Sequence, residues 1–214
     1  MADALRALPN NGKGPTCTPI VDTLGRRRKN AAMAEACPAK PVKLICGMIS
    51  ASRELFASAD KRLADAVGSV EIASEVWDFD FTDYYDGQMG CPLLRRFVAL
   101  AGLVQPDKLI EAKLLTNEIE AEFARGKTFG VDRPINLDPG YVAESKLVLA
   151  SMKDFSHRIY LGSGVYAEIT LMYRKGNWES LDWTFPDYAS GRYDSFLTEA
   201  RQSLRLESGK EHRK

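Results

Sequence analysis

Apolar and polar residues follow one another along the chain at two spacings, which predict helices and strands. Apolar residues repeat at helical spacing from Leu55 to Val67, and Gly68 then ends the run. The same spacing predicts a second helix from Pro106-Asp107 to Gly126. The predicted elements, in chain order, are a strand from Val42, a helix at 55–67, extended segments at 70–81 and 94–104, a helix at 107–126, an extended run at 135–137, a hairpin at 156–173 and a helix at 193–204.

The first six elements follow the order strand, helix, strand, strand, helix, strand, which is the split βαβ order of ferredoxin-like α+β folds. We therefore predict a ferredoxin-like sheet that the C-terminal hairpin extends, with helices mainly on one face. Residues 141–151 fit either a buried strand or a helix that starts at Asp138-Pro139, and we favour the helix. The predicted organisation is a disordered extension at 1–40, a single α+β domain at 41–207 and a flexible tail at 208–214.

The predicted hairpin turns at Gly162-Ser163-Gly164, where glycine permits the positive φ of a three-residue loop. One register keeps the apolar residues together on one face of the hairpin. In that register Tyr160 lies opposite Tyr166. Arg158 then lies opposite Glu168 on the same polar face.

Arg158 and Glu168 have two interpretations. We favour a cross-strand ion pair on a solvent-exposed sheet face over a catalytic or binding pair. His157 lies on the apolar face in this register, and we interpret it as a core residue with one hydrogen bond. Because the pKa of a free histidine is about 6.5, a role in acid–base chemistry stays open.

Composition limits the classes of partner. The 29 basic and 29 acidic residues give a formal net charge of zero, which provides no strong signal for nucleic acid. No apolar run approaches the length of a membrane span, and the N-terminus lacks the pattern of a secretory signal. The four cysteines show no zinc-site spacing. We therefore predict a cytoplasmic protein that does not enter a membrane.

Charged and aromatic residues gather at the ends of several apolar runs. Asp83 follows two other aspartates, and such oxygen ligands would suit Mg²⁺, although the cofactor is left unknown. Tyr84, Arg95 and Arg96 form a second group, because guanidinium binds phosphate in bidentate fashion while rings stack on bases. Asn136 and Asp138 form a third group beside a predicted Asp-Pro-Gly turn, and both residue types also favour turns for structural reasons.

Six sequence segments are DFTDYYDGQMG, LLRRFVAL, AKLLTNEIE, INLDPGYVAESKLVLAS, KDFSHRIYLGSGVYAEITLMYRKG and WTFPDY. Together they resemble a bacterial family of unknown function, domain-of-unknown-function number 4416. The resemblance runs from about Pro41 to Leu204. Members of this family are often labelled GTP-binding proteins, but the resemblance implies no established activity. This chain shows neither a phosphate loop nor an NKxD string that would support the label.

We predict an enzyme or ligand-binding domain that acts on a nucleotide or another phosphorylated small molecule. The candidate catalytic residues are Asp83, Asp138 and Glu168, and the candidate ligand-binding residues are Tyr84, Arg95, Arg96, Asn136, Lys153 and Arg158. In this hypothesis the arginines hold an anion, and Asp83 or Glu168 acts as a base or metal ligand. The alternative is a non-catalytic protein-interaction module whose sheet face presents Tyr160, Tyr166 and Trp178 to a partner. Oligomeric state is not predicted.

Overall fold

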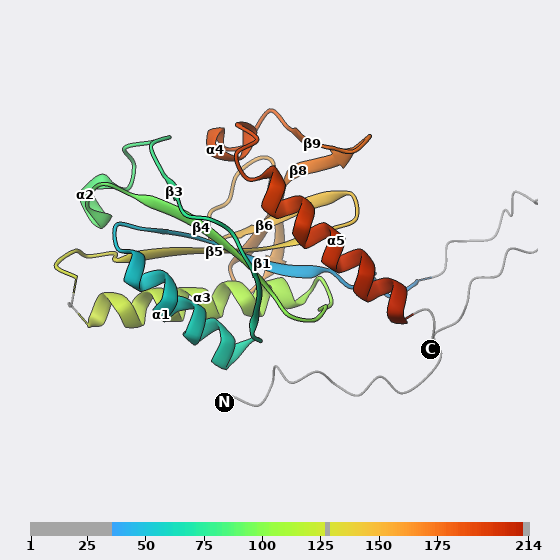
Figure 1. Cartoon of the computed structure of the whole chain (residues 1–214), viewed down its shortest axis with the longest axis horizontal. Helices are drawn as coiled ribbons and strands as arrows, with labels where there is room; N and C mark the ends of the chain where they lie inside the picture. Colours follow the sequence, from blue (N-terminus) through green and yellow to red (C-terminus); the bar gives the residue numbers. More distant parts are fainter. Residues whose placement is uncertain (1–35, 127–128, 212–214) are drawn as a thin grey trace, which may run out of the picture. The chain divides into compact units, whose positions relative to one another are not determined.

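The computed structural model describes residues 36–126 and 129–211, in which strands and helices are mixed along the chain (Figure 1). The first elements are β1 (Lys43–Ser50), α1 (Arg53–Ala66), β2 (Val70–Ala73), β3 (Trp77–Asp78), α2 (Asp86–Met89), β4 (Leu94–Leu100) and α3 (Lys108–Arg125). They are followed by β5 (Ile135–Ala143), β6 (Lys146–Ser151), β7 (Ile159–Gly162), β8 (Val165–Arg174), β9 (Asn177–Ser180), α4 (Pro186–Ala189) and α5 (Asp194–Glu211). The predicted α+β class is confirmed.

The nine strands of the described residues form one sheet in which every paired neighbour is antiparallel. The strand order is β2-β4-β1-β5-β6-β8-β7, while β3 also pairs with β4 and β9 with β8. Helix α1 connects β1 to β2, and the chain passes from β4 to β5 through α3. In both cases one strand of opposite direction lies between the two connected strands.

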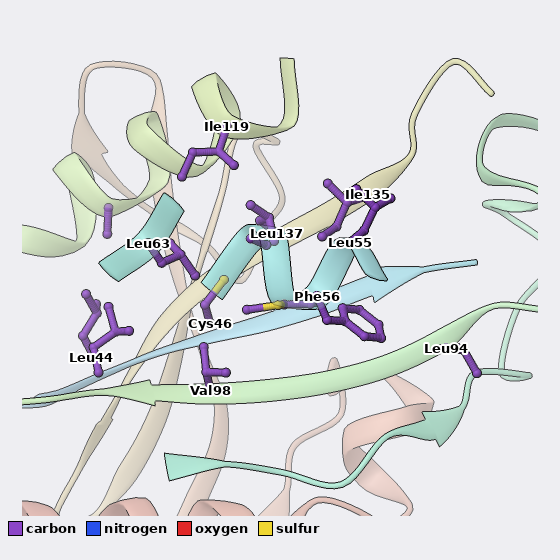
Figure 2. Packing of buried hydrophobic residues seen from close by; sticks show 14 residues of the cluster. Leu44, Cys46, Leu55, Phe56, Leu63, Leu94, Val98, Ile119, Ile135 and Leu137 are labelled. Carbon is purple, nitrogen blue, oxygen red and sulfur yellow. The ribbon is translucent and has the colours of Figure 1, made fainter. Parts of the chain in front are cut away.

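The two faces of the sheet carry separate apolar cores, because successive residues of a strand point to opposite faces. Cys46 of β1 packs in the core that α1 and α3 cover, and Figure 2 shows Leu63 and Ile119 of these helices in the same layer. The neighbouring Ile45 belongs to the other core, which includes Phe196 of α5. The prediction that helices lie mainly on one face is wrong, because the second apolar face also needs a cover and α5 provides it (Figure 1).

The three long helices are confirmed near their predicted positions as α1, α3 and α5. The predicted tail at 208–214 falls partly on α5, which continues to Glu211, and partly outside the described residues. Most of the predicted extension at 1–40 also lies outside them. No helix within residues 36–126 and 129–211 is long and apolar enough to cross a membrane.

The hairpin of β7 and β8 has the predicted register at Tyr160 but not at its turn. Gly162, and not Leu161, pairs with Val165, so the predicted three-residue loop is wrong and the loop has two residues, 163 and 164. Tyr160 pairs with Tyr166, and the pairing shifts between Tyr160 and Gly162 at the turn. Strand β7 begins at Ile159, whereas the prediction began it at residue 156. The residues before Ile159 therefore do not follow the strand alternation on which the predicted faces depend.

Two predictions about residues 138–151 are wrong. The favoured helix at 141–151 is instead the end of β5, a turn and strand β6. The predicted turn at Asp138-Pro139-Gly140 is instead continuous strand, because β1 pairs with β5 through all three residues. Local preference suits a turn or helix here, but pairing with β1 on one side and β6 on the other overrides it.

Candidate ligand-binding cavity

Strands β5 and β6 separate partway along their length, and this fork creates the candidate site. Their pairing covers Gly140–Ala143 of β5 and Lys146–Leu149 of β6. Before Gly140, β5 pairs with β1 from Ile135 onward, whereas β6 continues along β8 as far as Ser151. Residues 135–139 of β5 therefore have a strand partner on the β1 side but not on the β6 side.

Two side chains of α3 bind the backbone at this open edge. The Leu137 amide donates to Glu120 Oε1 at 2.7 Å, and the Leu137 carbonyl oxygen accepts from Lys113 Nζ at 3.1 Å. Burial raises the pKa of Glu120, although the nearby Arg133 opposes this shift. Because unpaired backbone groups are costly away from water, we interpret Glu120 and Lys113 as substitutes for a missing strand.

Pro139 and Gly140 stand where the fork closes. The hydrogen-bonding groups of Leu137 face away from β1, and the two-residue period of a strand directs those of Pro139 the same way. Proline has no amide hydrogen to donate, so it suits an edge without a partner strand. At Gly140 a Cβ atom would lie 2.5 Å from the Val148 carbonyl oxygen, so only glycine lets β5 and β6 approach there.

The fork leads into a cavity of about 600 Å³, within the range of about 300–1,000 Å³ that is typical of small-molecule sites. Its cationic lining residues are Arg95, Lys113, Arg133, Lys153 and Arg158. Its acidic lining residues are Asp138, Glu168 and Asp187. Its aromatic lining residues are Phe79, Phe81, Tyr84, Tyr85, Phe155, Phe185 and Tyr188.

Arg95 is a buried charge on the cavity wall, with 2% of its surface exposed. Its Nη2 donates to the Tyr188 hydroxyl at 2.6 Å, and its Nη1 lies 3.5 Å from Asp138 Oδ2. Its Nε is buried and has no hydrogen-bond partner among the described residues. Burial alone would lower the pKa of Arg95, but Tyr188, Asp187 and Asp138 outweigh it, so the pKa is raised. The wall therefore holds a permanent positive charge with an unused donor.

Gly47 of β1 makes room for the guanidinium of Arg95. A Cβ atom at Gly47 would lie 2.8 Å from Arg95 Nη2 and 2.9 Å from Phe97 Cε1. The guanidinium carbon also lies over the Phe97 ring, 4.6 Å from its centroid, and such a contact contributes roughly 0.5–2 kcal/mol. A glycine inside a buried strand thus permits a charged side chain to cross the sheet surface and reach the cavity.

Asp138 stands in a chain of polar side chains along the open edge of β5. Arg133 donates to Asn136 Oδ1, and Asn136 Nδ2 donates to Asp138 Oδ2 at 2.6 Å. Lys113 Nζ lies 4.0 Å from Asp138 Oδ1. The Asp138 side chain is 28% exposed, so its carboxylate is accessible to a molecule in the cavity.

Glu168 lies on the other side of the fork, where three side chains hold its carboxylate. Arg158 Nε donates to Oε2 at 2.7 Å, and His157 Nε2 lies 3.2 Å from the same oxygen. The Thr170 hydroxyl donates to Oε1 at 3.2 Å, and Arg158 Nη1 also donates to Ser151 Oγ at 2.8 Å. The predicted ion pair of Arg158 and Glu168 is confirmed, but its predicted exposure is wrong, because Glu168 is only 3% exposed.

His157 is not the core residue of an apolar hairpin face. Its ring is stacked with the rings of Phe155 and Trp183, and it faces Glu168. Ile159, which the prediction placed on the same apolar face, is 71% exposed. The interpretation fails because His157 precedes β7 and strand alternation does not orient it.

Lys153 and Tyr84 meet at the mouth of the cavity, where both are exposed. Lys153 Nζ donates to the Tyr84 hydroxyl at 3.1 Å and lies 5.0 Å from the centroid of its ring. This hydrogen bond lowers the pKa of Tyr84. Within the described part of the chain, Lys153 has no carboxylate partner that would balance its charge.

Seven of the nine predicted site residues line this one cavity: Tyr84, Arg95, Asn136, Asp138, Lys153, Arg158 and Glu168. Their roles stay predictions. Arg96 follows Arg95 in β4, so it points to the opposite face, where its Nη1 donates to Asp60 at 2.7 Å. Asp83 is exposed and lies outside the cavity lining.

Several lining residues were not among the predicted ones. The sequence pattern could have identified Lys113, because its spacing from Leu109 and Thr116 places all three on one face of a helix, and α3 buries that face. A lysine on a buried helix face needs a buried partner. Asp187 and Tyr188 of α4 carried no comparable signal, because only the packing of this short helix brings them to the cavity.

The described residues contain no group of three or more His, Cys, Asp or Glu side chains that is placed to hold a metal ion. Asp78 and Asp80 are exposed, and Asp80 lies 3.7 Å from Arg192. We therefore assign no ligand to Mg²⁺ in the cavity.

Comparison with known proteins identifies a family but no function. The family model described as Domain of unknown function (DUF4416) matches residues 40–204, which include every residue that lines the cavity. No match was found among curated proteins or among solved structures. The chain belongs to the DUF4416 family.

Proposed function

We propose that the fork cavity binds a phosphorylated small molecule of the nucleotide class. The observation that carries the proposal is a single lining that combines five cationic side chains with seven aromatic rings. Guanidinium and ammonium groups bind phosphate, and aromatic rings stack on planar bases. Three lining carboxylates and Glu120, which pairs with Arg133, oppose the five cations and leave one positive charge, that of Lys153, to attract an anion.

A thermal-shift panel of nucleotides, sugar phosphates and divalent cations tests this function. A ligand at 100 times its Kd stabilises the folded chain by about 2.7 kcal/mol and raises Tm accordingly.

Tyr84 is 62% exposed, so we expect Tyr84→Ala to fold normally and to lose about tenfold in affinity for a stacked base. Arg62→Ala is the matched control, because Arg62 pairs with Glu122 on an exposed surface. A panel without any shift would contradict the proposal, as would an equal loss in both variants.

If the chain is an enzyme, we propose Asp138 as its acid–base residue. Its carboxylate is accessible from the cavity, and among the described residues only its Oδ2 accepts a hydrogen bond, from Asn136. Both oxygens of Glu168 already accept, from Arg158 and Thr170. Asp138→Asn keeps the shape of the side chain, so we expect binding to persist and turnover to be lost. Unchanged turnover of a panel compound by this variant would exclude the assignment.

A second candidate function is a protein-interaction module, and the exposed apolar residues of the edge strand β7 favour it. Ile159 is 71% exposed and Tyr160 is 58% exposed. Trp178 does not belong to this surface, because it is buried and donates from Nε1 to Thr198 of α5. If no compound of the panel binds and Ile159→Lys abolishes a self-association seen by analytical ultracentrifugation, this function replaces the first.

We also propose that β2-β4-β1-β5, together with α1 and α3, is a ferredoxin-like unit. The strand order, the antiparallel directions and the shared core of the two helices support this assignment. A search of newly determined structures with this unit alone tests it. The remaining strands would then be an extension, which places the cavity at the junction of unit and extension.

A cytoplasmic location is part of the same proposal. Its support is the sequence pattern of cysteines without a disulfide framework or zinc spacing, which is typical of reduced compartments. Cell fractionation with an antibody against the full chain tests it, and recovery in a secreted or membrane fraction would contradict it.

A further inference from the structure

Charges are distributed unevenly around the fork cavity. We call the side at the open edge of β5 the floor. There Arg95 and Lys113 face Asp138, Arg133 pairs with Glu120, and Asp187 acts electrostatically on Arg95, so three cations accompany three carboxylates. Burial raises the pKa of Asp187, against the lowering effect of Arg95. The floor is therefore close to neutral.

The side formed by Ser151, Lys153 and Arg158, which we call the mouth, has an excess of positive charge. Arg158 is balanced by Glu168, but Lys153 has no acidic partner among the described residues. The Ser151 hydroxyl accepts from Arg158 at 2.8 Å and from the backbone amide of Lys153 at 3.1 Å. An anion at the mouth would meet an ammonium, a guanidinium and a hydroxyl group.

We propose that the cavity takes a nucleoside phosphate in one direction, with the phosphate at the mouth on Lys153 and Arg158 and the base on the floor beside Asn136 and Asp138. This inference rests on the proposed function and adds the direction of the ligand and the residues that select for its phosphate.

Two physical arguments favour this direction. A phosphate on the floor would bring its negative charge close to the carboxylates of Asp138 and Asp187, and repulsion from the buried Asp187 is costly. A neutral base avoids this repulsion and still offers acceptors. The unpaired Nε of Arg95 requires such an acceptor, and a ring nitrogen or carbonyl oxygen provides it without adding charge.

The experiment compares the four ribonucleosides with their 5′-monophosphates by isothermal titration calorimetry. Each pair differs by one phosphate, so the ratio of their affinities isolates the contribution of that group. For the wild type we expect the phosphate to raise affinity by about tenfold or more. Lys153→Gln should reduce this ratio by about fivefold and leave nucleoside affinity unchanged. Lys146→Gln is the matched control and should change neither value, because Lys146 begins β6, whereas Lys153 follows its end.

Floor variants give the opposite result. Asn136→Ala should weaken nucleoside and nucleotide by the same factor, so that their ratio stays constant. Asn117→Ala is a second floor variant for the case that Asn136→Ala misfolds, because Asn117 lines the cavity from α3 and is half-buried, whereas Asn136 is buried. Higher ionic strength should lower the ratio more for the wild type than for Lys153→Gln, in which Arg158 is the remaining cation at the phosphate.

The outcomes separate this inference from the function on which it rests. If nucleotides bind but Lys153→Gln leaves the ratio unchanged, the direction is wrong and the binding function stands. A ratio that falls in the floor variants instead would place the phosphate on the floor. If none of the eight compounds binds at millimolar concentration, the inference and the nucleotide function fail together.

Discussion

The two halves of β5 have different partners and different roles. Residues 140–142 lie between β1 and β6, with strand pairing on both sides and a buried Val142. Residues 135–139 pair with β1 alone, and their other edge is bound by Glu120 and Lys113. One half is therefore an ordinary central strand, and the other half is the wall of a cavity. A single strand can serve both purposes where its neighbour diverges.

The change between the halves occurs over two residues. Pro139 suits the open side because it has no amide hydrogen to donate, and Gly140 suits the closed side because no side chain fits there. The open half replaces the lost strand pairing with a carboxylate and an ammonium group from α3. The same comparison predicts that variants of the closed half affect mainly stability, whereas the open half responds to charge and pH.

The largest expected effect is in the closed half. In Gly140→Ala the new Cβ would lie 2.5 Å from the Val148 carbonyl oxygen, which is backbone and cannot rotate away. We expect the free energy of unfolding to fall by about 3 kcal/mol, the upper end of overpacking effects. Urea denaturation followed by tryptophan fluorescence measures this change.

Gly68→Ala is the matched control for this variant, because its Cβ would have the Ala101 carbonyl oxygen at an ordinary distance of 3.6 Å. We expect it to change stability by less than about 0.5 kcal/mol. Equal stability of the two variants would contradict the close approach of β5 and β6 at the fork.

An intermediate effect is expected for the side chain that binds the open half. Glu120→Leu leaves the Leu137 amide and Arg133 without this acceptor, so we expect a loss of about 2 kcal/mol in the free energy of unfolding. Glu120→Gln retains an acceptor oxygen and should lose less. If both substitutions are neutral, Glu120 does not replace a strand partner.

The raised pKa of Glu120 predicts that the free energy of unfolding depends on pH. Burial raises the pKa of Glu120 above its ordinary value of 4.5, so the folded chain binds more protons than the unfolded chain between these two values. The contribution of Glu120 to stability therefore falls as the pH rises from 4.5 through the raised pKa. Because Asp187 titrates in a similar way, the measured quantity is the difference in unfolding free energy between wild type and Glu120→Gln. A difference that does not change with pH would contradict the predicted shift.

The smallest expected effect is at Pro139. Pro139→Ala increases the freedom of the unfolded chain, so we expect a loss of about 0.5–1 kcal/mol in stability. The new amide at 139 faces the open side and should exchange with deuterium much faster than the amide of Val142. Strong protection of the amide at 139 would show that β6 can close the fork.

Sequence reasoning succeeded where the signal was local. The pairing of Tyr160 with Tyr166 follows from alternation over a few residues, and the structure confirms it. Arg95 and Arg96 illustrate the limit, since both were chosen for the chemistry of the guanidinium group. Only the sheet decides that Arg95 faces the cavity while Arg96 pairs with Asp60 on the other face.

The errors at residues 138–157 have a common physical cause. Asp138-Pro139-Gly140 has the composition of a turn, and residues 141–151 have the apolar content of a helix, so local preferences gave the wrong elements. His157 was placed on an apolar face because the strand was started three residues too early. In each case contacts between segments distant in the sequence decide the outcome.

The sequence by itself determined the α+β class, the three long helices, the pairing of Tyr160 with Tyr166, the family and five of the eight charged residues of the cavity. These features depend on residue type and on spacing within one segment. The tertiary structure alone decided that β5 and β6 diverge, that α3 binds the open edge and that α4 brings Asp187 to Arg95. A cavity is the space between segments, and its position depends on how those segments pack and not on the preferences of any one of them.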